Sequence, residues 1–577
     1  MSSIDLDKRK DGPIVEHDED AIPGLHYQTV DPHADPDAIS YGPNGVKGLF
    51  FSKYVFGAAT LASLGGFSMG YDMGVISIIN VMEPFHKAFP KAETSFGKGL
   101  MTGMLLLGAF IGCIFMSYLS DRISRKWAIT AMVVAFDIGA ILQTAAVNYD
   151  MLVAGRFIGG IGVGTLAMVS KALTTRPYSP PSQKTKEDQA LTQYPRYQGA
   201  PLYISEVSPP NMRGTLLVLE SISISAGVVI AYWITFGTRH MAGEACFRLP
   251  FGLQMVSATA LGLGIHFFPY SPRWLALVNR DAECLTSLTK LRNLPATDER
   301  VQIEYNSIIS EVRFQKIVQE RKHPGAKGLK LEILSWFDLF SKGTWKRTAV
   351  GCGIAFFQQF SGINAFIYYA PTLFESLGQS SEMSLILSGV FNVLQFVAAI
   401  ICFLLIEKIG RRPLAIGGAF GMAGAYVIIA VLSGVYSKNW QANMAAGWAC
   451  VAMAFVFILL YGVSYSPLGW AMPSEVFSTT SRSKGVALST CVIWLSDFII
   501  GLITPSMLAD IEYRTYIFFA VMCFVAGIWA ILLVPETSGK TLEEIDELFG
   551  DDSAKKEREI AAAALGSSSG ERGVMTV

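Results

Sequence analysis

The sequence predicts an all-α integral membrane protein with twelve transmembrane helices in two six-helix bundles, joined by a helical linker. Three observations lead to this fold class. Of the 577 residues, 51% are hydrophobic and only 16% are charged, against roughly 25% charged residues in soluble proteins. Twelve apolar runs are long enough to cross about 30 Å of hydrocarbon. The two halves of the chain also repeat each other's charged motifs.

The twelve runs are separated by short loops except in the middle of the chain. They start near Phe51, Leu100, Trp127, Met151, Thr215, Pro250, Ala349, Leu385, Leu414, Ala445, Val486 and Thr515. A charged, helix-forming stretch, 271–345, lies between the sixth run and the seventh. We therefore expect a disordered tail at 1–48, bundles at 49–270 and 346–536 on either side of the linker, and a second tail at 537–577.

The orientation in the membrane follows from the basic residues in short loops. The loop after span 2 carries Arg122, Arg125 and Lys126, and the loop after span 8 carries Lys408, Arg411 and Arg412, whereas the loop at 376–383 carries none. Because cytoplasmic loops are enriched in Lys and Arg, both termini and the linker are expected to be cytoplasmic.

The composition excludes several classes of protein. A net charge of −1, from 46 basic and 47 acidic residues, is not the strongly basic balance of a nucleic-acid-binding protein. Six of the eight cysteines lie inside apolar runs, where a small hydrophobic role is expected. His17, His26 and His33 lie in the polar first tail and are expected to be solvated. We expect neither a metal site nor a cofactor.

The repeated motifs indicate an internal duplication. Asp121-Arg-Ile-Ser-Arg-Lys after span 2 returns as Glu407-Lys-Ile-Gly-Arg-Arg after span 8. Glu206-Val with Arg213-Gly after span 4 returns as Glu475-Val with Arg482 after span 10. A duplicated six-span unit is typical of secondary transporters, whose two bundles rock about a site near the middle of the membrane.

Seven motifs, in this order, resemble the sugar porter family of the major facilitator superfamily, particularly fungal hexose transporters, over about 50–548. They are Gly70-Tyr-Asp-Met-Gly-Val-Ile-Ser, Asp121-Arg-Ile-Ser-Arg-Lys, Gly155-Arg-Phe-Ile-Gly-Gly-Ile-Gly-Val-Gly, Pro201-Leu-Tyr-Ile-Ser-Glu, Pro269-Tyr-Ser-Pro-Arg-Trp-Leu, Gln358-Gln-Phe-Ser-Gly-Ile-Asn and Pro535-Glu-Thr-Ser-Gly-Lys. The resemblance implies the major facilitator fold and a plasma-membrane transporter, not an enzyme. It would carry a monosaccharide such as glucose by alternating access with proton symport and function as a monomer. A facilitative uniporter and a non-transporting sugar sensor are the alternatives.

Asp72 and Arg156 are an acid and a base inside apolar runs of the first half. Asp72 is in the middle of span 1, where ionisation is costly, so it should be protonated, paired or facing water. Arg156 in span 4 is its natural partner. A carboxyl whose proton affinity depends on the nearness of an arginine can couple proton movement to conformation. In proton-linked sugar porters the matching Asp and Arg have this role; a static pair that fastens span 1 to span 4 is the alternative.

Sugar recognition needs many uncharged hydrogen-bonding groups, which amides supply. Gln358, Gln359 and Asn364 lie in span 7, and Asn392 lies in span 8. The resemblance implies that residues at these positions contact the sugar. It also implies aromatic platforms at Trp470 and Trp494, and outer gates at Tyr368 and Tyr369. For an isolated glutamine, an interhelical hydrogen bond would be the alternative.

The charged loop motifs are expected at the cytoplasmic ends of helices, where the resemblance implies ion-pair networks that hold this side shut. The network residues are Asp121, Arg122, Arg125, Glu206 and Arg213 in the first half and Glu407, Arg411, Arg412, Glu475 and Arg482 in the second.

Several positions depart from the family pattern. Ser117 and Ser124 replace glycines, and Tyr270 replaces a glutamate. Ser221 stands in place of a sugar-binding glutamine, and Ile493 and Asp497 in place of two asparagines. These changes leave the substrate open between a hexose, a pentose and a polyol. Asp137 in span 3 has no counterpart, and we expect it to face the bundle.

The largest departure follows Met168, where 169–198 inserts a polar segment with four prolines into what the family builds as one helix. Such a segment must leave the hydrocarbon. The amino acids can be encoded by codons that contain a splice donor, a branch point and a splice acceptor, in that order. Removal of the segment restores the family's spacing between the Gly-Val-Gly and Pro-Leu-Tyr motifs. We interpret it as a translated intron that the working protein lacks; a regulatory loop is the alternative.

Overall fold

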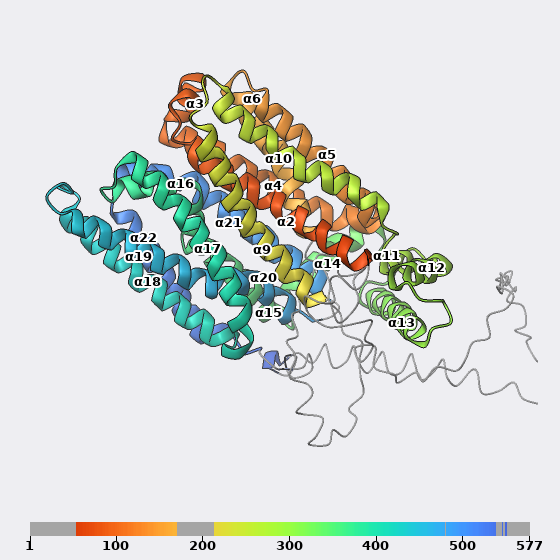
Figure 1. Cartoon of the computed structure of the whole chain (residues 1–577). Helices are drawn as coiled ribbons and strands as arrows, with labels where there is room; N and C mark the ends of the chain where they lie inside the picture. Colours follow the sequence, from red (N-terminus) through yellow and green to blue (C-terminus); the bar gives the residue numbers. More distant parts are fainter. Residues whose placement is uncertain are drawn as a thin grey trace, which may run out of the picture.

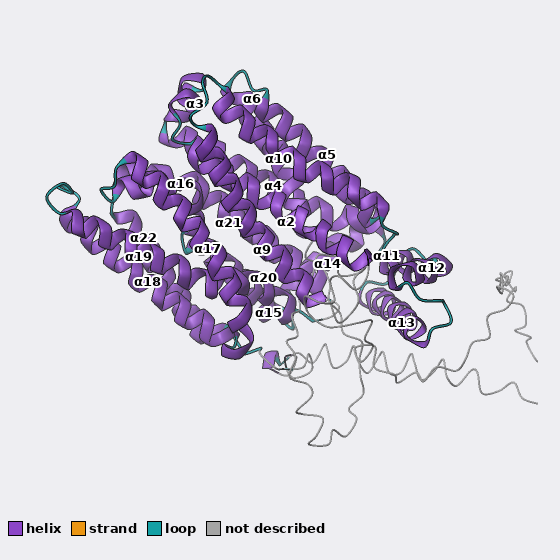
Figure 2. Cartoon of the chain, in the orientation of Figure 1, coloured by secondary structure: helices purple, strands orange, loops and turns teal. Residues whose placement is uncertain are grey.

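The computed structural model describes residues 53–169 and 213–550, apart from 479–480, 538–539, 541–544 and 546–547. Within this part of the chain every regular element is a helix, and Figure 2 shows helices and loops but no strands. The predicted all-α class is therefore confirmed. The expectation that the inserted segment leaves the hydrocarbon concerns 170–198, which lie outside the described residues, as do the first tail and most of the second.

The first bundle contains six helices that coincide with the first six apolar runs. They are α2 (Lys53–Ile79), α4 (Ser95–Ile123), α5 (Arg125–Thr144), α6 (Tyr149–Val169), α9 (Arg213–Thr238) and α10 (Ala245–Gly264). The shortest two have 20 residues and rise about 30 Å, the thickness of the hydrocarbon layer. The short helices α3 (Glu83–Ala88) and η2 (Pro90–Glu93) connect α2 to α4, and η4 (Ile265–Phe267) follows α10.

The second bundle contains six spans, two of which are broken into two helices each. They are α15 (Trp345–Phe360) with α16 (Ile363–Ser376), α17 (Ser381–Ile409), α18 (Arg411–Tyr436), α19 (Met444–Val463) with α20 (Tyr465–Val476), α21 (Arg482–Asp510) and α22 (Arg514–Leu533). By length and composition, eight segments of the described residues are apolar enough to cross a membrane, including all six spans of this bundle. The two-bundle architecture agrees with the prediction.

Four helices connect the bundles: α11 (Pro272–Leu277), α12 (Asp281–Arg292), α13 (Glu299–Lys322) and α14 (Gly328–Phe337), followed by η5 (Asp338–Phe340). Arg292 joins α12 to α13 through two hydrogen bonds to Glu304, at 2.6 and 2.9 Å. Figure 1 shows α11, α12 and α13 beside one end of the bundles. We call this the linker end, because α10 finishes there and α15 begins there; the opposite end, where α9 finishes and α10 begins, is the far end.

A glycine in the left-handed region breaks the seventh span. Gly362 has φ of 87°, and a Cβ at this position would lie 2.5 Å from the Tyr426 hydroxyl. Only glycine therefore fits the turn between α15 and α16. The break places Gln358 and Gln359 in the last turn of α15 and Asn364 in the first turn of α16. Discontinuous helices of this kind commonly form the binding sites of transporters.

The two bundles contact each other toward the far end. Tyr232 of α9 donates a hydrogen bond to the Leu385 carbonyl of α17 at 2.6 Å, and Arg239 forms an ion pair with Glu382 at 2.6 Å. The Asn80 amide reaches the Tyr368 carbonyl of α16 at 3.4 Å. Each contact joins a residue of the first half to one of the second. The helices α4 and α21 also pack closely, because a Cβ on Gly99 would lie 2.2 Å from the Leu502 carbonyl oxygen.

Candidate functional site

The two charged residues of the first bundle lie together in its interior. Asp72 of α2 and Arg156 of α6 form an ion pair with 3.6 Å between Oδ1 and Nη1, and both side chains are only 2% exposed. Gly70 helps to place the acid, because a Cβ there would lie 1.9 Å from the Ile224 carbonyl oxygen of α9. The missing side chain thus lets α2 approach α9 closely, two residues before Asp72.

The guanidinium of the pair donates hydrogen bonds to other groups, whereas the carboxylate accepts none within the described residues. Arg156 Nε donates to the Met101 carbonyl at 2.9 Å, and Nη1 lies 3.4 Å from the Gln143 amide oxygen. In the described part of the chain neither carboxylate oxygen of Asp72 accepts a hydrogen bond. An arginine pair that serves only as a fastener usually forms short, paired hydrogen bonds. The arginine is therefore fixed independently of the acid, which can gain or lose a proton without moving it.

The predicted amides gather at the break of the seventh span. Gln358 Nε2 donates to the carbonyls of Tyr465 and Ser466 in α20, at 3.2 and 3.1 Å. Asn364 Nδ2 donates to Gln359 Oε1 at 2.6 Å. All three amides are buried. They also connect the two broken spans, so that the amides lie where both helices are interrupted.

The two tyrosines predicted as outer gates hydrogen-bond α21 of their own bundle. Tyr368 donates to Asp497 Oδ2 at 3.1 Å, and Tyr369 donates to the Gly501 carbonyl at 2.7 Å. The Tyr368 backbone carbonyl accepts a hydrogen bond from the Asn80 amide of the first bundle, at 3.4 Å. This tyrosine therefore contacts both bundles.

Several buried polar atoms of the second bundle have no hydrogen-bond partner within the described residues. Four of them are Gln358 Oε1, Asn392 Oδ1, Trp494 Nε1 and Asp497 Oδ1, and others, such as Tyr426 Oη and Thr515 Oγ1, lie elsewhere in the bundle. Leaving such atoms unpaired costs about 1–3 kcal/mol each. A ligand with several hydroxyls satisfies donors and acceptors alike, because each hydroxyl both donates and accepts. The other predicted platform, Trp470 of α20, is half-buried.

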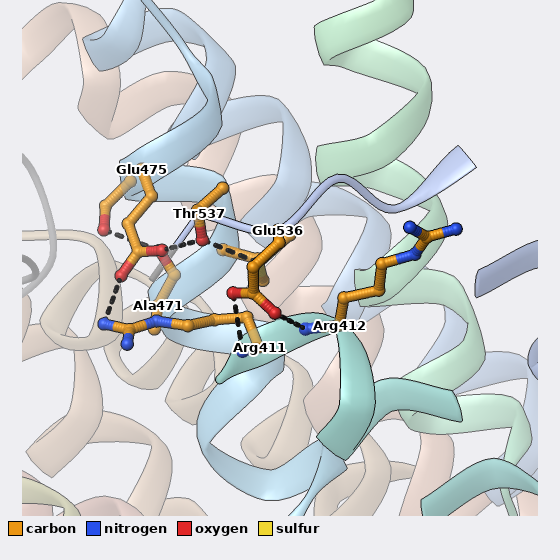
Figure 3. A network of polar contacts seen from close by, with 8 residues as sticks. Arg411, Arg412, Ala471, Glu475, Glu536 and Thr537 are labelled. Atoms are coloured by element: carbon orange, nitrogen blue, oxygen red, sulfur yellow. Dashed lines mark hydrogen bonds and ion pairs between the residues drawn. The ribbon is translucent and has the colours of Figure 1, made fainter. Parts of the chain in front are cut away.

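The charged network of the second bundle lies at the linker end (Figure 3). Arg411 Nη2 contacts Glu475 Oε1 at 3.1 Å, and the Thr537 hydroxyl donates to Glu475 Oε2 at 2.6 Å. Glu536 accepts hydrogen bonds from the backbone N–H groups of Arg411 and Arg412, at 3.0 and 3.1 Å. The Glu536 carboxylate caps the N-terminus of α18, and its negative charge interacts favourably with the helix dipole.

Within the described side chains the structure shows one ion pair of the predicted network, Glu475–Arg411. The Arg412 guanidinium donates to the Ile531 carbonyl instead of joining Glu475. Arg482 is buried beside the Phe477 carbonyl, at 3.3 Å. Arg125 is buried at the start of α5, whereas Arg122 is exposed. The side chains of Asp121, Glu206, Arg213 and Glu407 lie outside the described residues.

Some residues around the site were not predicted. Gln143 beside Arg156, Asn80 beside Tyr368, and Glu536 and Thr537 in the Pro-Glu-Thr motif all form contacts described above. The signal that could have found Gln143 and Asn80 is an amide inside an apolar run. Asp137 of α5 accepts a hydrogen bond from Thr259 of α10 at 2.9 Å, so it faces its own bundle, as expected.

The twelve-span helical architecture, with its broken seventh and tenth spans, is the fold of the major facilitator superfamily. Two solved structures share the fold. The proton:xylose symporter XylE bound to 6-bromo-6-deoxy-D-glucose matches with a TM-score of 0.65 and 24% identity, covering 86% of this chain and 99% of that chain. The inward-open xylose transporter XylE from E. coli matches with a TM-score of 0.63 and 23% identity, covering 85% and 99%.

The sequence places the chain more narrowly. The family model for sugar (and other) transporters matches residues 58–176 and 196–549. The high-affinity glucose transporter of Kluyveromyces lactis is 30% identical over 526 residues, 88% of each chain. The sugar transporter STL1 of Saccharomyces cerevisiae is 31% identical over 507 residues, 85% of this chain and 80% of that one. The chain therefore belongs to the sugar transporter family, whose members named here are transporters rather than enzymes.

Proposed function

We propose that this sugar transporter is a proton symporter for a monosaccharide, a hexose such as glucose, that works by alternating access. The observation that carries the proton coupling is the Asp72–Arg156 pair, buried and without a hydrogen bond to either carboxylate oxygen in the described part of the chain. A proton that binds Asp72 removes its attraction to Arg156. Protonation thus removes an electrostatic interaction between α2 and α6 in the interior of the first bundle.

The sugar site proposed here consists of the neutral groups of the second bundle. Gln358, Gln359, Asn364 and Asn392 supply the amides, and Trp470 and Trp494 supply the aromatic surfaces for the C–H faces of the ring. The unpaired atoms on α15, α17 and α21 support this assignment, because a polyhydroxylated ligand pairs them without burying a charge. Tyr368 and Tyr369 would separate this site from the far end, where α16 meets α2.

Alternating access in this proposal exchanges two sets of contacts. The bundles meet toward the far end, through Tyr232, Arg239 and their partners on α17. The Glu475–Arg411 pair at the linker end belongs to the network that would hold that end shut in the opposite conformation. Loss of this pair would favour conformations open at the linker end. With both termini and the linker in the cytoplasm, the far end faces outward across the plasma membrane.

Uptake measurements test the proposal. A panel of radiolabelled hexoses, pentoses and polyols is offered to cells that express the chain, with and without a protonophore. We expect accumulation of at least one hexose above its external concentration, abolished by the protonophore. Uptake that never exceeds equilibrium and ignores the protonophore would identify a uniporter. Sugar binding without uptake would identify a sensor, and either result overturns symport.

A further inference from the structure

A second buried carboxyl lies in the other bundle, at Asp497 of α21. Its side chain is buried and Tyr368 is its hydrogen-bond donor, at 3.1 Å from Oδ2. Oδ1 has no hydrogen-bond partner within the described residues. Trp494 lies one helical turn earlier on the same face of α21, and its indole Nε1 is unpaired as well.

The neighbours of Asp497 are polar but carry no positive charge. Tyr368, Tyr369 and Tyr461 are the titratable groups that face it from α16 and α19. Asn364 is a further polar neighbour. Within the described chain no Lys, Arg or His forms an ion pair with this carboxyl.

The charges of the first bundle do not compensate Asp497. Arg156 faces Asp72 and is fixed by the Met101 carbonyl and Gln143. Within the described residues neither charge forms an ion pair with Asp497, and both Tyr368 and Tyr369 interact with Asp497 on one side and Arg156 on the other. An ionised carboxylate with only neutral polar neighbours, Tyr368 and Asn364, and no cation beside it is expensive to bury. The proton-bearing acid is the cheaper form while the site is closed to water.

We propose that Asp497 binds a substrate hydroxyl directly, in its protonated form, and so makes the affinity for sugar depend on pH separately from Asp72. The proton on Oδ1 donates a hydrogen bond to a substrate hydroxyl oxygen. When the site opens to water, this proton passes to water and the carboxylate can then only accept hydrogen bonds. Because water solvates an ionised carboxylate strongly, the substrate hydroxyl competes less well for it and the substrate dissociates more easily. This role rests on the proposed sugar site.

The test is equilibrium binding of radiolabelled D-glucose to the purified full-length chain from about pH 5 to about pH 8, the range in which buried carboxyls can titrate. Binding is measured in Asp72→Asn, where Asp72 cannot contribute, and in Asp72→Asn with Asp497→Asn. We expect the first variant to lose affinity with rising pH, by up to about tenfold per pH unit, the limit for one proton. The second should change by less than about twofold, because the amide keeps a donor at every pH.

Asp137→Asn in the Asp72→Asn background is the matched control. Asp137 is also an acid within a span, but it lies on α5 against Thr259, so its loss should leave the pH dependence unchanged. Tyr368→Phe is a second probe that does not alter the acid. It removes the donor that favours the ionised form, and should therefore move the midpoint of the pH dependence upward.

Two results overturn the role of Asp497 and leave sugar transport standing. One is a pH dependence that persists when both acids are amides, and the other is affinity that does not change with pH in Asp72→Asn. A role confined to holding Tyr368 in place would give the second result, with lower yield of folded Asp497→Asn. Absence of binding of any sugar by the unmodified chain would instead overturn the proposed function, and this inference with it.

Discussion

Two buried arginine–carboxylate pairs in this molecule differ in how completely their charges are satisfied. In the linker, Arg292 and Glu304 share two short hydrogen bonds, at 2.6 and 2.9 Å. In the first bundle, Arg156 and Asp72 approach only to 3.6 Å, and the acid accepts no hydrogen bond within the described residues. The first geometry stabilises one arrangement of two helices. The second leaves the acid free to exchange its proton, which a coupling residue requires.

The largest expected effect comes from removing the charge of the loose pair. Asp72→Asn cannot release a proton and should abolish accumulation of sugar. In the proposed symport, 100 mV of membrane potential supplies about 2.3 kcal/mol per charge moved, or about a fifty-fold gradient. Sugar exchange across the membrane should remain partly intact, because it needs no net proton movement. Uptake of labelled sugar against a gradient, compared with exchange in preloaded vesicles, measures both. Undiminished uphill transport by Asp72→Asn would contradict the coupling role.

The corresponding acid-to-amide substitution in the Arg292–Glu304 pair should affect stability instead of coupling. Glu304→Gln leaves Arg292 buried without its carboxylate, which costs roughly 3–5 kcal/mol. We expect a lower thermal unfolding temperature in detergent, with the ratio of accumulation to exchange unchanged in the protein that folds. If Glu304→Gln lost proton coupling at normal stability, the length of the ion pair would not distinguish a structural pair from a proton-coupling pair.

Neutral groups at the sugar site provide the third test. Gln359→Ala and Asn364→Ala each remove an amide and leave a sugar hydroxyl unpaired, at about 1–3 kcal/mol, or about five- to hundred-fold in affinity. The apparent constant for sugar should rise while surface expression and proton coupling remain. Kinetics of uptake over a range of sugar concentrations measure this. If both variants kept the original constant, neither residue would belong to the site.

Most of the fold could be predicted, because each membrane-spanning helix is a continuous apolar stretch of the sequence and needs no knowledge of distant residues. The Asp72–Arg156 pair could also be predicted, because burying an unpaired charge in a span is costly and opposite charges in one bundle therefore tend to pair. The contact of Tyr368 with Asp497 could not, because 129 positions separate the residues and only the packing of α16 on α21 joins them. The capping of α18 by Glu536 depends in the same way on where the chain returns after α22.

An exposed pair at the far end should give a smaller effect. Arg239 and Glu382 connect the two bundles, and the Glu382 side chain is 63% exposed. Because solvent screens an exposed carboxylate, such a pair contributes little, so Glu382→Gln should shift the balance toward conformations open at the far end only slightly. Distances between spin labels on α9 and α17 measure this shift. Glu244→Gln is the control, because its partner Arg248 lies in the same bundle. An equal shift in both variants would exclude a bridging role for Glu382.

The least change is expected from deleting a whole segment, 169–198, which spans thirty residues of the first half. In the second half the chain passes from α20 to α21 with only 477–481 between them, whereas the first half contains this polar stretch after α6. The family model matches residues up to 176 and again from 196, leaving most of the stretch unmatched. If the segment is a translated intron, joining Met168 to Gly199 gives Gly-Val-Gly-Thr-Leu-Ala-Met-Gly-Ala-Pro-Leu-Tyr-Ile-Ser-Glu, an unbroken run of the family spacing. The deleted chain should then transport sugar at least as well as the full chain, because the spacing that the family builds as one helix is restored. Sequencing the mature transcript is the companion measurement: a dominant message that retains all thirty codons, together with lost transport in the deleted chain, would establish a working loop.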